Sequence, residues 1–182
     1  MPVARADTAG LGRTSCPNEQ TEQPFAPFGD PASYALVPGG SFESDGPAWN
    51  TSGSTQLVTD NEPWGAGSQA ISLSPGSSVT SPATCIGLLS PTMRFFARST
   101  GGSPSSSLQV SVTFKSVLGL IDTLPVGSVQ ASDAWEPTPQ YLLVINALSL
   151  LPGYRLVAFQ FTPAGDANWE IDDVYVDPWS KG

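Results

Sequence analysis

The chain has 182 residues, a formal net charge of −9 and only 7 lysines and arginines, so we expect neither nucleic acid nor an anionic membrane surface as a partner. Histidine is absent, which removes the usual general base, a common zinc ligand and the Ser-His-Asp triad. Glycine and proline number 18 each while charged residues make up 13%, a balance typical of a turn-rich all-β domain.

The first 34 residues show no hydrophobic period and are predicted to form an irregular N-terminal arm. Ala4-Arg5-Ala6 has the small-x-small form of a signal-peptidase site, so residues 1–6 are interpreted as a signal-peptide remnant. Phe25 and Phe28 stand between prolines, and an extended segment of this kind packs either on its own domain or on a neighbouring subunit.

From residue 35 to 179 the sequence predicts an antiparallel β-sandwich of eight to ten short strands, of the jelly-roll kind. The stretch Leu108–Lys115 alternates most cleanly, with apolar residues inward and Gln109, Ser111 and Thr113 outward. The other expected strands cover residues 34–37, 55–59, 70–74, 78–81, 92–98, 117–124, 141–145, 154–162 and 169–177.

Two cysteines, Cys16 and Cys85, predict a disulfide and therefore an oxidising compartment, with the chain secreted or extracellular. Closing so long a loop contributes roughly 4 kcal/mol in the chain-entropy model. Two unpaired buried thiols are the alternative interpretation. No run of about 18 apolar residues is present, so no membrane insertion is expected.

The expected last strand contains two adjacent carboxylates, Asp172 and Asp173. Side chains alternate faces along a strand, so both cannot point into the same solvent. One of them is expected to face a cation, backbone N–H groups or a basic side chain.

Three short motifs, Gly39-Gly40-Ser41-Phe42-Glu43, Trp49 and Ile171-Asp172-Asp173-Val174, resemble the jelly-roll carbohydrate-binding-module superfamily, which is galactose-binding-domain-like. The resemblance covers roughly residues 38–177 and implies a jelly roll. It also implies that Glu43 and Asp172, with Asp173 beside it, bind a structural calcium ion that joins the first and last strands. Carboxylates and backbone carbonyls are suitable calcium ligands. The alternative is that these carboxylates only accept hydrogen bonds.

Sugar-binding modules stack pyranose rings on exposed aromatic side chains. Trp64 and Trp135 are the principal candidates here, with Asp60 and Asn61 beside Trp64 to bind hydroxyl groups; Trp179 and Tyr141 are further candidates. Trp49 and Trp169 are expected to pack in the core instead.

No pair of carboxylates is brought together by the sequence pattern as glycosidases require, so the chain is predicted not to be an enzyme. The favoured function is a secreted, calcium-stabilised module that binds extracellular or cell-wall carbohydrate. The alternative is an extracellular structural or self-assembling surface or filament subunit, whose arm contacts a neighbouring copy.

Overall fold

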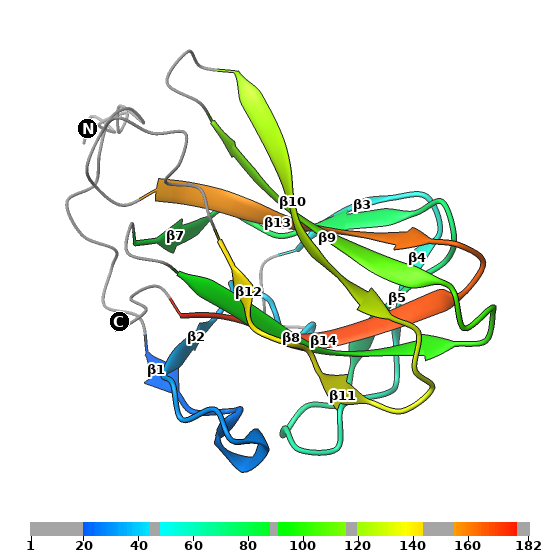
Figure 1. Ribbon diagram of the computed structural model, residues 1–182, viewed down its shortest axis with the longest axis horizontal. Helices are drawn as coiled ribbons and strands as arrows, with labels where there is room; N and C mark the ends of the chain where they lie inside the picture. Colours follow the sequence, from blue (N-terminus) through cyan, green and yellow to red (C-terminus); the bar gives the residue numbers. More distant parts are fainter. Residues whose placement is uncertain (1–19, 44–47, 88–90, 116–119, 144–154, 178–182) are drawn as a thin grey trace, which may run out of the picture.

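The computed structural model describes residues 20–43, 48–87, 91–115, 120–143 and 155–177, and in these ranges two antiparallel sheets pack face to face (Figure 1). Sheet A consists of β1 (Thr21–Glu22), β2 (Tyr34–Leu36), β14 (Asn168–Asp177), β5 (Ala70–Leu73), β4 (Thr55–Val58), β8 (Thr92–Thr100), β11 (Glu136–Pro137) and β12 (Tyr141–Leu142). Sheet B consists of β10 (Ile121–Gln130), β9 (Ser107–Lys115), β13 (Arg155–Ala164), β6 (Ser78–Thr80), β3 (Asn50–Ser52) and β7 (Thr84–Ile86). The prediction of an all-β sandwich with the jelly-roll fold is confirmed.

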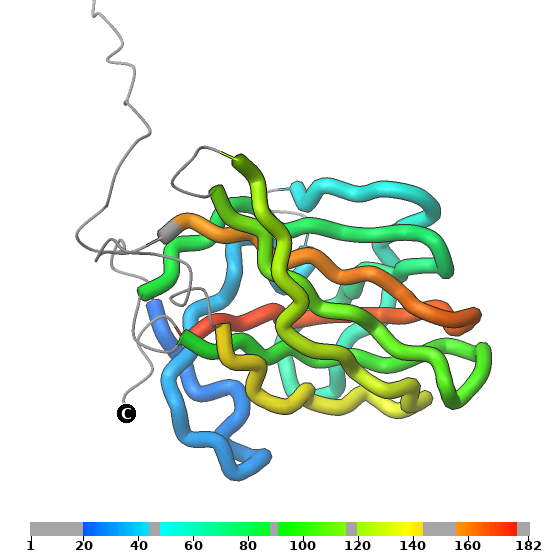
Figure 2. The backbone as a smooth tube through the Cα atoms, turned by 45° about the horizontal axis from the view of Figure 1, so that its top comes forward, coloured from blue at the N-terminus to red at the C-terminus, as the bar shows by residue number. Residues whose placement is uncertain are grey.

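The strand β14 is the centre of sheet A. It pairs with β8 along one edge, and along its other edge with β5 and then with β2. The strands β14 (red) and β13 (orange) lie in different sheets, as the ribbon of Figure 1 and the tube of Figure 2 show. The last described strand therefore joins the N-terminal strand to the middle of the chain.

The main core lies between the sheets and follows the alternation in the sequence. In β9, Leu108, Val110, Val112 and Phe114 are all buried, as predicted. Trp49 and Trp169 also belong to this core, which confirms their predicted role. At about 25 cal/mol per Å² of buried apolar surface, such large rings contribute strongly to stability.

Several elements differ from the prediction. The strand β10 continues to Gln130 through Pro125, which is tolerated because β10 is an edge strand and has a bulge between Pro125 and Gly127. The short strands β1, β3, β7 and β11 were not predicted, because two or three residues give no readable period. Parts of three expected strands, residues 117–119, 144–145 and 154, lie outside the described residues.

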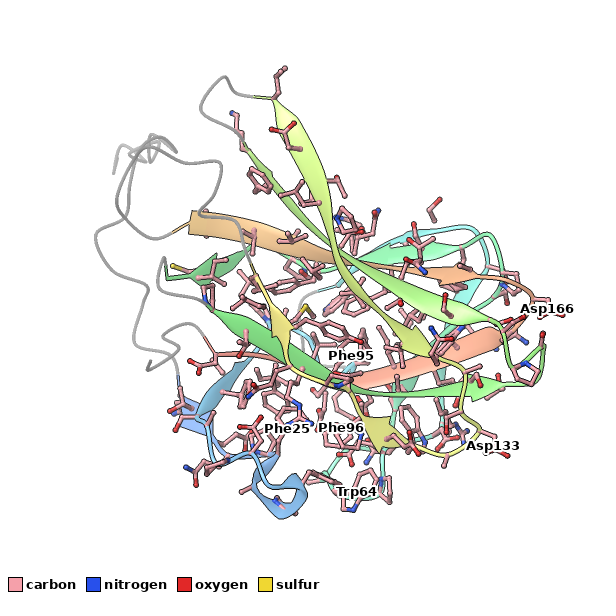
Figure 3. All side chains as sticks on the ribbon, viewed as in Figure 1. Phe25, Trp64, Phe95, Phe96, Asp133 and Asp166 are labelled. Atoms are coloured by element: carbon pink, nitrogen blue, oxygen red, sulfur yellow. The ribbon has the colours of Figure 1, made fainter. Side chains whose placement is uncertain are left out.

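The described part of the predicted arm packs on the outer face of sheet A. It contains β1 and the 3-10 helix η1 (Ala26–Phe28), and within the described ranges no helix has the length and apolar character to cross a membrane. Phe25 is fully buried against Tyr34, Phe96 and Tyr175. Figure 3 shows Phe95 between the sheets and Phe25 and Phe96 on the opposite side of β8.

A buried ion pair fixes this segment to the sheet. The guanidinium of Arg94 lies 4.3 Å from the ring centre of Phe25 and 2.7 Å from Asp30 Oδ2. Tyr34 and Gln140 also donate hydrogen bonds to that carboxylate, at 2.7 and 3.0 Å. Residues 25–34 are thus held to their own domain.

Candidate functional site

A cavity of about 810 Å³ opens on the outer face of sheet A, between β1 and the loop that follows β4. We call it the acidic cavity. It is lined by Glu22, Pro24, Ser41, Glu43, Glu62, Trp64, Gly65, Ala66, Gly67, Phe96, Asp173 and Tyr175. Four of these twelve residues are carboxylates and three are aromatic, so the cavity combines negative charge with flat apolar surface.

A bulge in β14 forms the floor of this cavity. The pairing register with β8 shifts between Asp172 and Tyr175, and Asp173 has φ 46°, a left-handed conformation that is uncommon outside glycine. Gly40 packs directly on the bulge: a Cβ there would lie 2.8 Å from the carbonyl oxygen of Val174. The bulge breaks the strand alternation and turns two successive carboxylates toward one region.

Asp172 is the more deeply buried of the two, with 0% of its surface exposed. Its Oδ1 accepts a hydrogen bond of 2.8 Å from the N–H of Asp173, whereas its Oδ2 has no hydrogen-bond partner among the described residues. Burial, with the neighbouring charge of Asp173, raises the pKa of Asp172 to about 8. The site therefore disfavours an ionised Asp172 unless a cation compensates it.

Glu62 meets Asp173 from the loop after β4. Glu62 is 1% exposed and its Oε2 accepts a 2.6 Å hydrogen bond from the N–H of Trp64. Its Oε1 has no N–H or hydroxyl donor among the described residues, and its carboxyl group can share a proton with that of Asp173. Burial, followed by the charge of Glu62, raises the pKa of Asp173 to about 7. Gly65 leaves room for both groups, since a Cβ there would collide with Glu62 Oε1 and lie 2.9 Å from Asp173 Oδ2.

Glu43, the third predicted metal ligand, contacts the same loop further along. Its Oε1 accepts hydrogen bonds from the N–H groups of Ser68 and Gln69, at 2.6 and 2.9 Å. The hydrogen bond from the backbone of Ser68 is the main cause of the lowered pKa of Glu43. The described contacts of Glu43 thus order the loop that forms one wall of the acidic cavity.

The nearest cations are paired elsewhere. Arg98 forms ion pairs with Asp60 and, at 2.7 Å, with Glu170, while Arg94 pairs with Asp30. No lysine or arginine lines the acidic cavity in the part of the chain that the structure describes. The charge of the cavity is therefore not compensated by its own wall.

These carboxylates meet some, but not all, of the requirements of a calcium site. Among the described residues, no three cysteine, aspartate or glutamate side chains converge as a ready metal site. Two buried carboxylate oxygens, Asp172 Oδ2 and Glu62 Oε1, nevertheless lack a donor. Calcium accepts backbone carbonyls together with carboxylates, so a complete set of three carboxylates is not required.

Trp64 supplies the aromatic wall of the cavity. It is 48% exposed, and its ring stacks on Phe96 at 5.4 Å with an interplanar angle of 28°. Phe28 contacts it edge-on at 4.8 Å. These two supports fix the ring from behind while leaving much of it open, which is the arrangement that stacking of a flat ligand requires.

Of the other predicted sugar-binding residues, none that the structure describes is part of the cavity lining. Trp135 lies under the guanidinium of Arg98 at 5.3 Å, and its Nε1 donates to Asp60 Oδ1 at 3.4 Å. Asn61 donates from Nδ2 to the carbonyl of Glu62 at 2.6 Å. Tyr141 is buried, with its hydroxyl donating to the Ser128 carbonyl, and Trp179 lies outside the described residues.

Sequence reasoning missed Glu62 and Glu22. Glu62 stands directly before Pro63-Trp64-Gly65-Ala66-Gly67, and the two glycines so close to a tryptophan signal a backbone that approaches other groups closely. Glu22 gave no such signal. Glu22 reaches the cavity only because β1 pairs with β2. There, Tyr175 of the neighbouring strand β14 donates a 2.6 Å hydrogen bond to its carboxylate.

The outer face of sheet B has a different character. Along β9 and β13 its outward positions carry Gln109, Ser111, Thr113, Gln160 and Thr162, and within these two described strands none carries an aromatic ring. Stacking surface is therefore found on sheet A, at the acidic cavity.

No protein-family profile matches the chain, and no curated protein sequence matches it. Solved structures do. The C-terminal family 22 carbohydrate-binding module of Clostridium thermocellum Xyn10B matches with TM-score 0.54 and 14% identity, over 82% of this chain and 96% of that one. The family 11 carbohydrate-binding module of a Clostridium thermocellum cellulosomal cellulase matches with TM-score 0.52 and 11% identity, over 81% and 95%.

The enzymatically active domain of tailspike protein 4 from bacteriophage CBA120 also matches, with TM-score 0.54 and 16% identity. The match includes 78% of this chain but only 21% of the tailspike chain. At these identities the matches establish the fold. The predicted resemblance to jelly-roll carbohydrate-binding modules is thus confirmed at the level of architecture.

Proposed function

We propose that this chain is a non-catalytic domain that binds an extracellular or cell-wall polysaccharide in the acidic cavity. The observation that carries the proposal is the half-exposed ring of Trp64, supported by Phe96 and set among carboxylates. A sugar ring can stack on the indole while carboxylate oxygens accept hydrogen bonds from its hydroxyl groups. The cavity volume of about 810 Å³ falls in the usual range for small-ligand sites.

Binding to a panel of insoluble and soluble polysaccharides tests this proposal, with Trp64→Ala as the decisive variant. Leu156→Ala is the matched control, because Leu156 is 54% exposed and lies on β13 of sheet B. We expect wild type and Leu156→Ala to bind one glycan class equally and Trp64→Ala to lose that binding. A wild type that binds no glycan, or a Trp64→Ala variant that binds as well as wild type, contradicts the proposal.

We further propose that the domain is stabilised by calcium. Asp172 and Asp173 would hold the ion together with backbone carbonyls, with Glu43 ordering the loop beside them. The buried Asp172 Oδ2, which has no donor among the described residues, supports this assignment, because burying unpaired charge is costly. Calorimetric titration of calcium into chelator-treated protein tests it, and an Asp172→Asn variant that binds calcium as tightly as wild type contradicts it.

Secretion and a Cys16–Cys85 disulfide complete the proposal. Cys85 is 6% exposed in β7, and Cys16 lies outside the described residues, so the pairing stays a prediction. Thiol titration of the denatured, unreduced protein is expected to find no reactive cysteine, and two reactive thiols would contradict it. For the alternative of a self-assembling subunit, the described arm residues offer no support, since they pack on their own sheet.

A further inference from the structure

We infer that the acidic cavity selects glycans that carry free amino groups over neutral or acidic glycans, an inference that rests on the proposed glycan binding. The ligand class is an oligosaccharide of protonated amino sugars. Its ring would stack on Trp64 and its ammonium groups would pair with the carboxylates of the wall.

The charge of the cavity is the first reason. Glu22, Glu43, Glu62 and Asp173 line it, and no cationic side chain of the described residues does. Coulomb attraction in a site of low dielectric favours a ligand that brings the missing positive charge. A glycan with carboxylate or sulfate groups would instead be repelled.

Glu62 is the second and independent reason. This side chain is 99% buried and lines the cavity, and its Oε1 atom meets no N–H or hydroxyl donor of the described residues, so that only the neighbouring carboxyl group of Asp173 can share a proton with it. Buried polar atoms are normally paired, and the unpaired ones demand an explanation. A donor from a ligand supplies one, and a cationic N–H donor makes the stronger, charge-assisted hydrogen bond.

The aromatic wall is compatible with the same ligand. A cation within about 6 Å of an indole face is attracted by the negative face of the ring. Trp64 can therefore interact with an aminated sugar in two ways: the apolar face of the sugar ring stacks on the indole, and the ammonium group is attracted to the indole face. A neutral sugar would gain only the stacking.

The proposed calcium ion does not remove this preference. Asp172 together with the four acidic residues of the wall makes five carboxyl groups, and one divalent ion compensates the charge of only two of them. Glu22 is exposed at the β1 side of the cavity, where the Tyr175 hydroxyl donates to it at 2.6 Å. It remains available to a ligand whether or not calcium is bound.

The test compares three oligosaccharides of equal length: a β-1,4-linked glucosamine oligomer, its fully N-acetylated form and the corresponding glucose oligomer. Affinities are measured by calorimetry for wild type, Glu22→Gln and Asp122→Asn, each with calcium and with chelator. Asp122 is exposed on β10 of sheet B, so its variant removes one charge without touching the cavity.

We expect wild type to bind the glucosamine oligomer about tenfold more tightly than the other two, the effect of one charge-assisted contact. Glu22→Gln should reduce that preference severalfold, and Asp122→Asn should leave it unchanged. Equal affinity for all three oligomers overturns the inference while leaving the proposed function intact. An equal loss in both variants also overturns it, because the preference would then reflect the net charge of −9 alone. Binding of none of the three, in a protein that binds another polysaccharide through Trp64, overturns the inference only; binding of no glycan at all overturns both.

Discussion

Replacing Asp172 with asparagine should stabilise the calcium-free protein and remove the further stability that calcium gives to wild type. The amide keeps the Oδ1 acceptor that the N–H of Asp173 uses at 2.8 Å, but it cannot ionise. In wild type without calcium, the unfolded chain ionises Asp172 near its ordinary pKa, whereas burial raises the pKa in the folded protein to about 8.

The sign and size of the effect follow from linkage. The folded state holds the proton of Asp172 longer as the pH rises, so the contribution of Asp172 to the stability of calcium-free wild type is fully present below about pH 4 and is lost by about pH 8. By pH 7 the loss amounts to about 4 kcal/mol, from three pH units at about 1.4 kcal/mol each. For a domain of this size that corresponds to roughly 8–16 °C in Tm. The raised pKa of Asp173 adds a contribution of the same sign.

Thermal unfolding at pH 5 and pH 7.5, in chelator and in saturating calcium, measures this. In chelator at pH 7.5 the Asp172→Asn variant should melt higher than wild type, and at pH 5 the gap should shrink. In calcium the gap at pH 7.5 should shrink by about 2.7 kcal/mol, because wild type gains that amount at a hundredfold excess over Kd and the variant does not. A variant that is less stable by the same amount under all four conditions would refute the reasoning and leave Asp172 as a hydrogen-bond acceptor only.

Three further changes test neighbouring features. Phe25→Ala should lower the free energy of unfolding by about 3–4 kcal/mol in urea titrations, since a fully buried ring is lost; a loss under 1 kcal/mol would show that the arm is not part of the core. Arg94→Met should cost about 3 kcal/mol because it leaves Asp30 without its cation, and adding Asp30→Asn should recover part of that; no recovery would argue against the pair. Gly65→Ala should abolish the rise in Tm with calcium, because the new Cβ would lie 2.9 Å from Asp173 Oδ2 and displace that carboxylate; an unchanged rise would place the ion elsewhere.

The fold could be predicted because its long strands carry a readable period. Leu108 to Phe114 alternate in the sequence and all four apolar residues are buried. In β8 the same holds for Met93, Phe95 and Ala97. The other face of β8 could not be read, because Arg94, Phe96 and Arg98 look like ordinary outward residues until the segment of residues 20–36 covers the first two of them.

The site was predictable in its carboxylates but not in its surroundings. The pair Asp172 and Asp173 stands out in the sequence because two charges interrupt an apolar strand. What the pair faces depends on the bulge and on Glu62, which arrives from a loop more than a hundred residues away. Trp135 and Asp60 were grouped with Trp64 by residue type, yet the structure joins them to Arg98 instead.

The position of β14 has a consequence for how the molecule assembles. Tyr175 and Val176 pair with Leu36 and Ala35, so an early strand finds its main partner only when one of the last strands has been made. Sheet A therefore cannot close before β14 has been made, and β8 keeps an open edge until β14 inserts. Pairings of such long sequence separation make folding slow, and a newly made chain would expose Phe25 and Phe96 to solvent and to chaperones during that delay.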